Sequence, residues 1–409
     1  MKGFFVFIIV NYVIKLITKK EVYNMFDEKV TRLGTNSIKW DRYNNEDIIA
    51  MGTADMDFMS PPSVTEALIS RAKVGMFAYE LISDSYYNAI IDWYAQMYNW
   101  NIKKEWLSSS PGIWAGIRIC IDSFTMPGDK IIVHSPTFHP IIDIIEQSGR
   151  SLVTNSLVLK DGYYSLDFED FENKIANNVK MFILINPQNP SGRVFTNEEL
   201  IRIGEICNKY KVLVISDEVH GGVVFVGHKH IPYASISEEF AKNSIVITAA
   251  SKAFNLQGMT HGILIIPNKH LRNIYQTALT GYDFDFATNV FSLAAVEAAY
   301  RYGRPWLDEL ITYLQCNLLY LIEYFEVNIP KIKVIKPEGS YMVWLDCREL
   351  KMNEDELETF FMIKAKVALT FGSSFGKDGE GFVRINIACS RNILKEALER
   401  IKGAVNSII

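Results

Sequence analysis

Short apolar runs that alternate with helical segments are the feature that most constrains the fold of this chain. The runs rich in Ile and Val lie at 129–136, 179–187, 211–218, 243–251 and 261–267. Continuous runs without polar alternation are typical of strands buried on both faces, as in a parallel sheet. Helical patterns lie between them, and strands that alternate with helices predict an α/β domain covered on both sides.

Two helical patterns are clear in this part of the chain. In segment 196–210, Thr196 and Glu199 have the spacing of a capping box, and an apolar stripe follows at Leu200, Ile203 and Ile206. Segment 85–98 also has helical spacing, and we expect its buried face to carry Ile90, Ile91, Tyr94 and Met97.

The C-terminal part has a different pattern. Strands and long helices mix there, and the chain ends in an amphipathic helix with Ile393, Leu394, Ala397, Leu398 and Ile401. We expect residues 26–60 to join a small α+β domain at 300–409, and residues 61–299 to form the large domain.

Composition limits the partners. The 409 residues are 49% apolar and 22% charged, which is typical of a globular protein with a sizeable core. The net charge of −5 and the absence of a Lys/Arg-rich run argue against nucleic acid as a partner. The cysteines, Cys120, Cys207, Cys316, Cys347 and Cys389, are scattered, which predicts reduced thiols in the cytoplasm and no metal site.

The first residues need a separate interpretation. Residues 1–25 contain an apolar stretch that is interrupted by Asn11 and Lys15. It is short for a membrane span and lacks the cleavage site of a signal peptide. We interpret these residues as an N-terminal extension and expect Met25 to be the initiator. A membrane anchor is the alternative.

Polar and aromatic residues follow several of the apolar runs. They are Phe138, Asn189, Asp217 with His220, and Lys252. Each has an ordinary structural interpretation: a turn, a helix cap or a surface position. In an open α/β sheet, however, ligands bind beyond the carboxyl ends of the strands, where these side chains would meet.

Together these residue types match the needs of pyridoxal phosphate (PLP). PLP requires a lysine amine for its aldehyde, an acid opposite its pyridine nitrogen, a donor near its ring hydroxyl and an aromatic ring to stack on. Lys252, Asp217, Asn189 and Phe138 supply these groups. Its phosphate requires a helix N-terminus, and the turn before Ile113 and Trp114 offers one.

Several motifs carry a family resemblance. "NPQNPSG", "SDEVH" and "SKAFN", in this order, resemble class I/II aminotransferases, which are fold-type I PLP enzymes. "ADMDFMSPPSVTEAL", "PEGSYMVWLDCREL" and "GEGFVRINIACSR" are similar to the MalY/PatB group of cystathionine β-lyases. The resemblance implies an α/β fold with a large domain, whose mostly parallel seven-stranded sheet lies between helices, and a smaller α+β domain.

The resemblance also implies roles for individual residues. Lys252 would bond to PLP, Asp217 would pair with the ring nitrogen, and Asn189 would face the ring hydroxyl and the substrate. The other cofactor contacts implied are His220, Phe138, Ile113, Trp114 and Ser251. Arg384 would bind the substrate carboxylate. Tyr79 would reach into the neighbouring site of a homodimer.

The chain departs from the family pattern at four positions. They are Gly52, where Trp is common; Trp114, where Val is common; Gly222, where an acid is frequent; and Thr260, where many members carry Arg. We expect Gly52 and Trp114 to reshape the substrate pocket or the phosphate contacts.

The activity expected from the resemblance is β-elimination on cystathionine or related β-thio amino acids, which yields a thiol, ammonia and pyruvate. The alternative is an aminotransferase that acts on aromatic or other amino acids, since the same residues serve both reactions. A regulatory protein that binds a transcription factor and a structural protein without cofactor are further alternatives.

Overall fold

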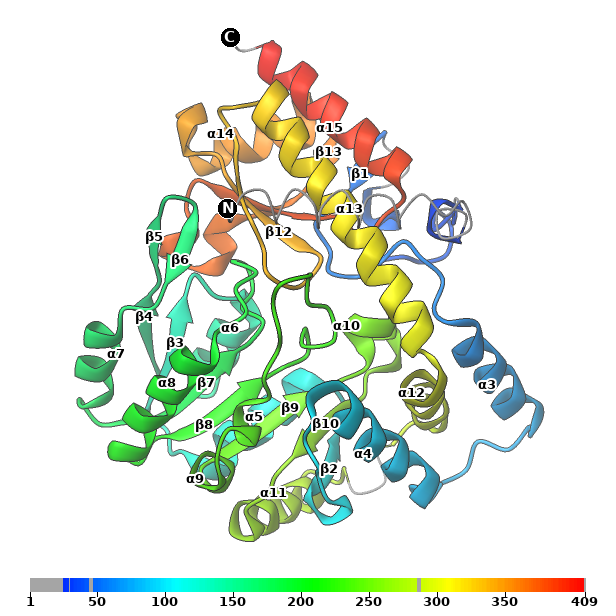
Figure 1. The fold of residues 1–409 in the computed structure, drawn as a ribbon, viewed down its shortest axis with the longest axis vertical. Coiled ribbons are helices and arrows are strands. Elements are labelled where there is room, and N and C mark those ends of the chain that lie inside the picture. Colours follow the sequence, from blue (N-terminus) through cyan, green and yellow to red (C-terminus); the bar gives the residue numbers. More distant parts are fainter. Residues whose placement is uncertain (1–24, 29, 44–46, 285–287, 408–409) are drawn as a thin grey trace, which may run out of the picture.

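The computed structural model describes residues 25–28, 30–43, 47–284 and 288–407 (Figure 1). Of the proposed extension at residues 1–25, residues 1–24 lie outside the described residues, so its interpretation stays a prediction. In the part of the chain that is described, no helix has both the length and the apolarity needed to cross a bilayer.

The large sheet has seven strands and is mostly parallel, as expected. Its order is β2 (Leu107–Ser110), β10 (Gly262–Ile265), β9 (Ser244–Thr248), β8 (Leu213–Asp217), β7 (Val179–Ile185), β3 (Lys130–Ser135) and β4 (Ser151–Ser156). Strands β9 to β4 are parallel, whereas β10 is antiparallel to both of its neighbours. A strand buried on both faces has the same apolar run in either direction, so the sequence at 261–267 did not reveal this reversal.

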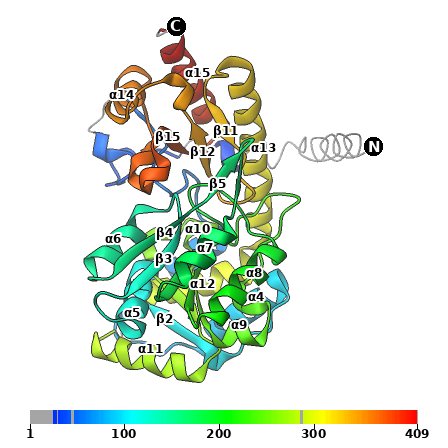
Figure 2. The ribbon, with the colours of Figure 1, turned by 90° about the vertical axis from the view of Figure 1, so that its left-hand side faces the viewer.

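Helices cover both faces of this sheet (Figures 1 and 2). One face packs against α5 (Ile113–Phe124), α6 (His139–Gln147) and α11 (Lys269–Gly281), and the other against α7 (Phe168–Ile175), α8 (Asn197–Lys209) and α9 (Glu238–Lys242). The side chains of neighbouring strand residues point to opposite faces of the sheet. Ile183 packs on the face covered by α5, α6 and α11, and Leu184 packs on the face covered by α7, α8 and α9. This two-sided burial explains the uninterrupted apolar runs.

The predicted helices are present, with one difference in the buried face. The capping box of Thr196 and Glu199 begins α8. Helix α4 (Asp84–Tyr98) buries Ile90 and Tyr94 as expected, but Ile91 and Met97 are only half-buried. Its other buried residues are Tyr86, Ala89 and Trp93. The face is rotated because α4 packs against α12 (Val290–Tyr302), where Trp93 stacks on Tyr300.

The C-terminal part forms a second layer of structure beside the large sheet (Figure 2). Its antiparallel sheet has the order β11 (Lys333–Ile335), β12 (Met342–Asp346), β15 (Phe382–Asn386) and β14 (Thr370–Phe371). The helices are α13 (Arg304–Asn328), α14 (Glu354–Thr359) and α15 (Arg391–Asn406). Helix α15 buries Leu394, Ala397, Leu398 and Ile401, whereas Ile393 is half-buried.

The N-terminal segment lies against this C-terminal part. Strand β1 (Ile49–Ala50) pairs in parallel with β13 (Val367–Ala368), and Phe26 packs against Trp306 and Tyr313. The limits at residues 60 and 299 stay a prediction. The remaining elements are α3 (Pro62–Lys73), the hairpin of β5 (Val158–Lys160) and β6 (Tyr163–Ser165), and the short α10 (Ser251–Phe254).

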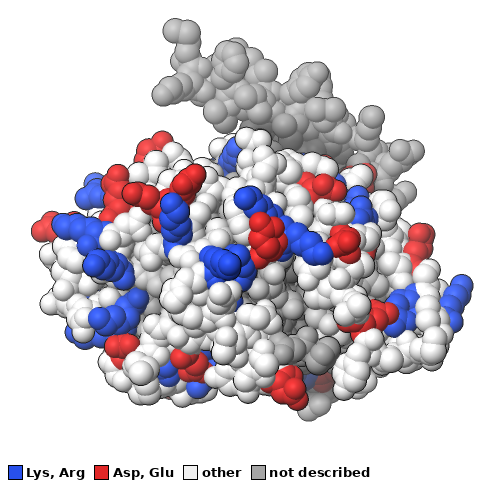
Figure 3. All heavy atoms as spheres, turned by 90° about the horizontal axis from the view of Figure 1, so that it is seen from below, with Lys and Arg blue, Asp and Glu red and all other residues white. Residues whose placement is uncertain are grey.

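The surface carries charges of both signs. On the face shown in Figure 3, Lys and Arg side chains are interspersed with Asp and Glu side chains. Such a mixed face does not form the basic stripe by which proteins bind nucleic acid.

Candidate active site

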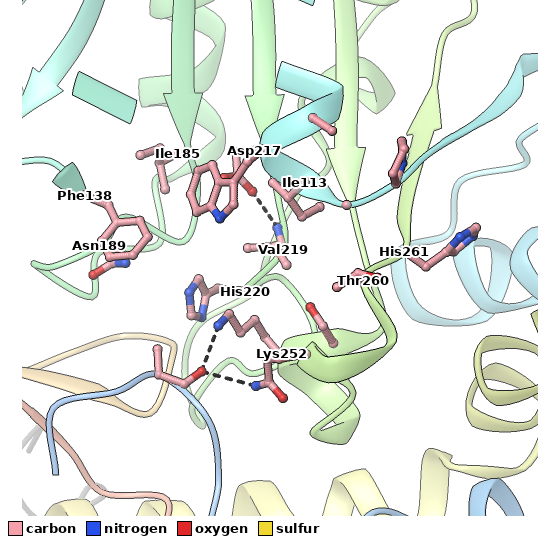
Figure 4. A pocket seen from close by; sticks show the side chains of 17 residues that line it. Ile113, Phe138, Ile185, Asn189, Asp217, Val219, His220, Lys252, Thr260 and His261 are labelled. Carbon is pink, nitrogen blue, oxygen red and sulfur yellow. Dashed lines mark hydrogen bonds between the residues drawn. The ribbon is translucent and has the colours of Figure 1, made fainter. Parts of the chain in front are cut away.

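A cavity of about 420 Å³ lies at the carboxyl ends of the parallel strands (Figure 4). Ile185 ends β7, Asp217 ends β8, and Lys252 follows β9, so three neighbouring strands deliver side chains to it. The first residues of α5 form another part of its wall, and Ala54 of the N-terminal segment also lines it. The position agrees with the rule for open α/β sheets.

Lys252 is the second residue of α10 and points into this cavity (Figure 4). Its Nζ donates a hydrogen bond to the Ala54 carbonyl oxygen at 2.8 Å. Burial lowers the pKa of the Lys252 amine to about 8, and the positive charge of Arg384 acts in the same direction. About a tenth of this amine is therefore neutral at pH 7, and about half at pH 8.

Asp217 is 3% exposed and faces the same cavity. The backbone N–H of Val219 donates to its Oδ1 at 3.1 Å. Burial raises the pKa of the Asp217 carboxyl to about 6. The adjacent Glu218 instead accepts hydrogen bonds from Ser216, His230 and Tyr233, so only Asp217 is free to face a ligand in the cavity.

Arg384 lies on β15, behind Asn189, and is 2% exposed. Its Nη1 donates to Asn189 Oδ1 at 2.9 Å and its Nη2 to the Gly52 carbonyl at 3.2 Å, while its Nε has no hydrogen-bond partner. Within the described ranges it forms no ion pair, and burial lowers its pKa to about 9. A buried guanidinium without a carboxylate partner favours an anionic ligand.

The N-terminus of α5 lies in the wall of the cavity. Gly112 caps this helix at φ +137° without a side-chain hydrogen bond, so the first N–H groups stay available next to the cavity. Ile113, Trp114, Ser251 and Thr260 line the cavity in the same region. At this position many members of the family that the chain resembles carry Arg, so Thr260 supplies a neutral hydroxyl group to the cavity wall where an arginine would supply a cation.

His220 and Phe138 complete the predicted set. His220 lines the cavity with its Nδ1 3.1 Å from Ser340 Oγ, and burial lowers its pKa. The Phe138 ring lies 5.5 Å from the Trp114 ring, so the two form one aromatic wall.

The comparisons with known proteins agree with this geometry. The family model described as aminotransferase class I and II matches residues 46–401. The chain belongs to this family. The cystathionine β-lyase PatB of Bacillus subtilis (strain 168) is 39% identical over 93% of this chain and 100% of its own length. MalY of Escherichia coli (strain K12) is 30% identical over 94% of this chain and 99% of its own. The predicted resemblance to the MalY/PatB group is therefore confirmed.

A solved structure is also closely similar. A PLP-bound protein from Clostridium difficile 630, provisionally assigned as an aminotransferase, has a TM-score of 0.91 and 42% identity, with 94% of this chain and 100% of that chain covered. The fold-type I architecture expected from the sequence is confirmed by this likeness and by the seven-stranded sheet.

Most of the predicted site residues meet in the cavity. Those that line it are Ile113, Trp114, Phe138, Asn189, Asp217, His220, Ser251 and Lys252. Arg384 is not among them, although it donates a hydrogen bond to Asn189, which is. Tyr79 also lies outside the cavity, 86% exposed, in the segment between α3 and α4. Its predicted contact is with a second subunit, so its role stays a prediction.

The structure adds residues that the sequence did not single out. Ala54, Gln257 and His261 line the cavity. Ala54 acts through its backbone carbonyl, which no side-chain pattern can reveal. His261 follows Thr260 directly, and its Nε2 lies 2.6 Å from the buried Tyr86 hydroxyl. The only signal available for it was a histidine at the start of an apolar run.

Two departures from the family pattern affect backbone packing. A Cβ on Gly52 would lie 2.9 Å from the Leu369 carbonyl carbon, and a Cβ on Gly222 would lie 2.9 Å from the Ala253 Cβ. Gly52 is not among the residues that line the cavity, and it acts on the site through its carbonyl bond to Arg384. Its small size therefore brings the N-terminal segment close to β13 and β14.

Proposed function

We propose that this chain is a PLP-dependent cystathionine β-lyase, a C–S lyase. It would cleave cystathionine or related β-thio amino acids by β-elimination to a thiol, ammonia and pyruvate. The observation that carries the proposal is the presence of a half-buried amine, Lys252, and a buried carboxylate, Asp217, in the wall of one cavity. The 39% identity to PatB over its full length supports the activity.

The residues of the cavity fit PLP. A volume of about 420 Å³ is in the usual range for a cofactor site. Lys252 supplies an amine with a pKa of about 8, and Asp217 supplies a carboxylate that is ionised above pH 6. The uncapped N-terminus of α5 and the hydroxyls of Ser251 and Thr260 would hold the phosphate. Trp114 and Phe138 offer the aromatic wall.

Each side chain then has a chemical task. PLP, when bound, withdraws electrons from the bonds at the substrate Cα. Lys252 would take the Cα proton, which its lowered pKa permits near neutral pH. Asp217 would keep the pyridine nitrogen protonated by charge pairing. His220 and Asn189 would orient the ring through contacts along its edge.

Arg384 would bind the substrate α-carboxylate. The guanidinium lies between the rings of Phe138 and Phe375, at 5.5 and 4.9 Å from their centroids, so its plane is held without a counter-ion. Asn189 connects it to the large domain through the 2.9 Å hydrogen bond. A bidentate carboxylate would complete its hydrogen bonding, including the unpaired Nε.

The functional unit in this proposal is a homodimer. The segment between α3 and α4 exposes several large apolar side chains: Val74, Met76, Phe77, Tyr79 and Leu81. Leu81 is 92% exposed. Such a continuous apolar surface is typical of an interface. Tyr79 would reach the cavity of the second subunit from this segment.

A cytoplasmic location belongs to the same proposal. All five cysteines are free thiols, and four of them are buried. Free thiols are typical of proteins that stay in a reducing compartment.

An aminotransferase is the second candidate. The 42% identical C. difficile structure carries that provisional assignment, and the same lysine, aspartate and arginine serve both reactions. The two activities differ after Cα deprotonation. Elimination releases a Cβ leaving group and needs no second substrate, whereas transamination needs a keto acid to accept the amino group.

Incubation with cystathionine alone separates the two candidates. We expect sustained release of thiol and pyruvate over many turnovers without any keto acid. A single stoichiometric turnover, resumed only when a keto acid is added, would establish the aminotransferase instead. Borohydride reduction and peptide mapping should place the cofactor on the "SKAFN" peptide that contains Lys252.

A further inference from the structure

The backbone carbonyl of Ala54 accepts hydrogen bonds from three donors, two from the segment after β9 and one from just before β12. Lys252 Nζ donates to it at 2.8 Å, Tyr341 Oη at 3.1 Å and Gln257 Nε2 at 3.2 Å. Figure 4 shows the bond from Lys252 as a dashed line. Gln257 also donates to the Tyr341 hydroxyl at 3.3 Å, so the three donors form one connected group.

The segment that carries this carbonyl is fixed on both sides. Asn386 Nδ2 donates to the carbonyls of Thr53 and Asp55, at 2.7 and 2.6 Å, directly beside Ala54. Farther along, the buried Lys39 and Asp57 form an ion pair at 2.8 Å. The Ala54 oxygen is therefore held in place by contacts that do not involve Lys252.

We propose that the Ala54 carbonyl is the resting point of the Lys252 amine whenever that amine is not bonded to PLP, and that Tyr341 and Gln257 are positioning residues for it. This inference rests on the proposed function. A lysine that acts first as an attachment point and then as a base must stay near the reacting carbon after it is released. A fixed acceptor limits the movement of its long, flexible side chain.

The shared carbonyl also limits how strongly the amine is held. A carbonyl oxygen has two lone pairs, and here three donors compete for them. An acceptor reserved for Lys252 would favour the charged ammonium, which cannot accept a proton. By donating to the same oxygen, Tyr341 and Gln257 weaken that preference, and the amine stays available as a base.

The test uses the cofactor-free protein and measures the rate at which PLP bonds to Lys252 as a function of pH. The bond forms when the neutral amine attacks the PLP aldehyde with loss of water, and absorbance follows it. Tyr341→Phe frees the carbonyl for the ammonium, so we expect the half-maximal pH to rise by about 0.5–1 unit, a ~3- to 10-fold slower reaction at pH 7. Gln257→Leu should shift it in the same direction.

Tyr275→Phe is the matched control. Tyr275 is also a fully buried tyrosine that donates to a backbone carbonyl, Ser109 at 3.2 Å, but it lies on α11 outside the cavity. It should leave the half-maximal pH unchanged. Because Tyr341 is buried and its variant can fail to fold, the half-buried Gln257 provides the second, independent variant.

The outcomes are distinct. The proposed role of the Ala54 carbonyl is wrong if neither Tyr341→Phe nor Gln257→Leu shifts the half-maximal pH of PLP bonding. It is also wrong if Tyr275→Phe shifts this pH equally. If the wild-type protein does not bond PLP at Lys252 at all, the proposed function fails and this inference fails with it. The wild-type measurement thus separates the two failures.

Discussion

Among single residues, two lysines, the buried Lys39 and the half-buried Lys252, have different hydrogen-bond acceptors. Lys39 is 1% exposed and pairs with Asp57 at 2.8 Å, with Arg32 and Trp40 also bonded to that carboxylate. Lys252 donates instead to a neutral carbonyl. A buried ion pair keeps its lysine charged, whereas a buried lysine without a bonded carboxylate gives up its proton more easily. Only the second arrangement yields a base.

The stability of the cofactor-free protein should report this difference. The pKa of Lys252 is about 8 in the folded chain, against about 10.4 for an unfolded lysine. Between these values the unfolded chain binds the additional proton, so the stability of the wild-type protein rises with pH. Below pH 8 the charged amine is costly, and Lys252→Met should stabilise the folded state by roughly 2 kcal/mol at pH 7.

Urea unfolding at several pH values checks this prediction. The advantage of Lys252→Met should shrink as the pH rises from 8 to 10.5. Lys39→Met is the comparison, and it should destabilise the protein at pH 7 because it removes one of the two cations that pair with the buried Asp57 and leaves Arg32 as the other. If Lys252→Met stabilised the protein equally at every pH, the lowered pKa of Lys252 would not be the cause of the stabilisation.

Substitution of Arg384 should impair the use of substrate. Arg384→Lys keeps the positive charge but removes the planar fork, so we expect kcat/KM for cystathionine to fall ~100-fold or more. PLP content should stay unchanged because Arg384 is not among the residues that line the cavity. The exposed Arg304, paired with Asp308 on α13, is the control, and Arg304→Lys should have little effect. Equal losses in both variants would rule out the substrate contact.

At the scale of elements, the start of α5 depends on one glycine. Gly112 has φ +137°, a conformation that residues with a Cβ rarely adopt, although a Cβ there would meet no atom closer than 4.0 Å. A residue with a Cβ at position 112 would therefore strain the backbone without a side-chain clash. The backbone N–H groups that follow Gly112 are the ones proposed to hold the phosphate.

Gly112→Ala should therefore lower the free energy of unfolding by roughly 1–3 kcal/mol and weaken PLP binding. Gly403→Ala is the matched control: Gly403 lies in α15, has open space around its Cα and should gain roughly 0.5–1 kcal/mol. Chemical denaturation and equilibrium dialysis with PLP give the two readouts. If Gly112→Ala binds PLP as tightly as the wild type, the α5 N-terminus is not the phosphate site.

At the scale of the whole molecule, the site joins parts that are distant in the sequence. Arg384 of the C-terminal sheet bonds to Asn189 of the large domain, and Ala54 of the N-terminal segment bonds to Lys252. Arg193, which follows the Asn189 loop, also pairs with Glu338 before β12 at 2.9 Å. The cavity is thus complete only when these parts of the chain pack together.

The proposed dimer extends this assembly to a second chain, and mixing of inactive variants tests it. Tyr79→Ala lacks the residue supplied to the neighbour, and Lys252→Ala lacks the amine. If each site takes Tyr79 from the other subunit, a mixture that exchanges subunits should recover up to about a quarter of the wild-type activity. Leu81→Asp should reduce the mass measured by light scattering. A monomeric wild-type protein would exclude the shared site.

The features that depend on local patterns could be predicted from the sequence. The apolar runs identified the strands, the Thr196–Glu199 spacing identified the start of α8, and residues after strand ends identified Asp217 and Lys252. These features can be read because burial and capping act on residues that are close in the chain. The apolar and capping patterns did not assign chemical roles to individual residues. Those roles came from the family resemblance of "SKAFN" and "GFVRINIACSR".

The contacts between groups that are distant in the chain could not be predicted in this way and are known from the folded structure. The direction of β10, the rotated face of α4 and the convergence of Lys252, Gln257 and Tyr341 on Ala54 come from the packing of whole elements. Lys252 and Ala54 are 198 residues apart, and the acceptor is a backbone atom that every residue possesses. No local pattern marks one carbonyl among hundreds, because its role is created when separately formed elements pack around it.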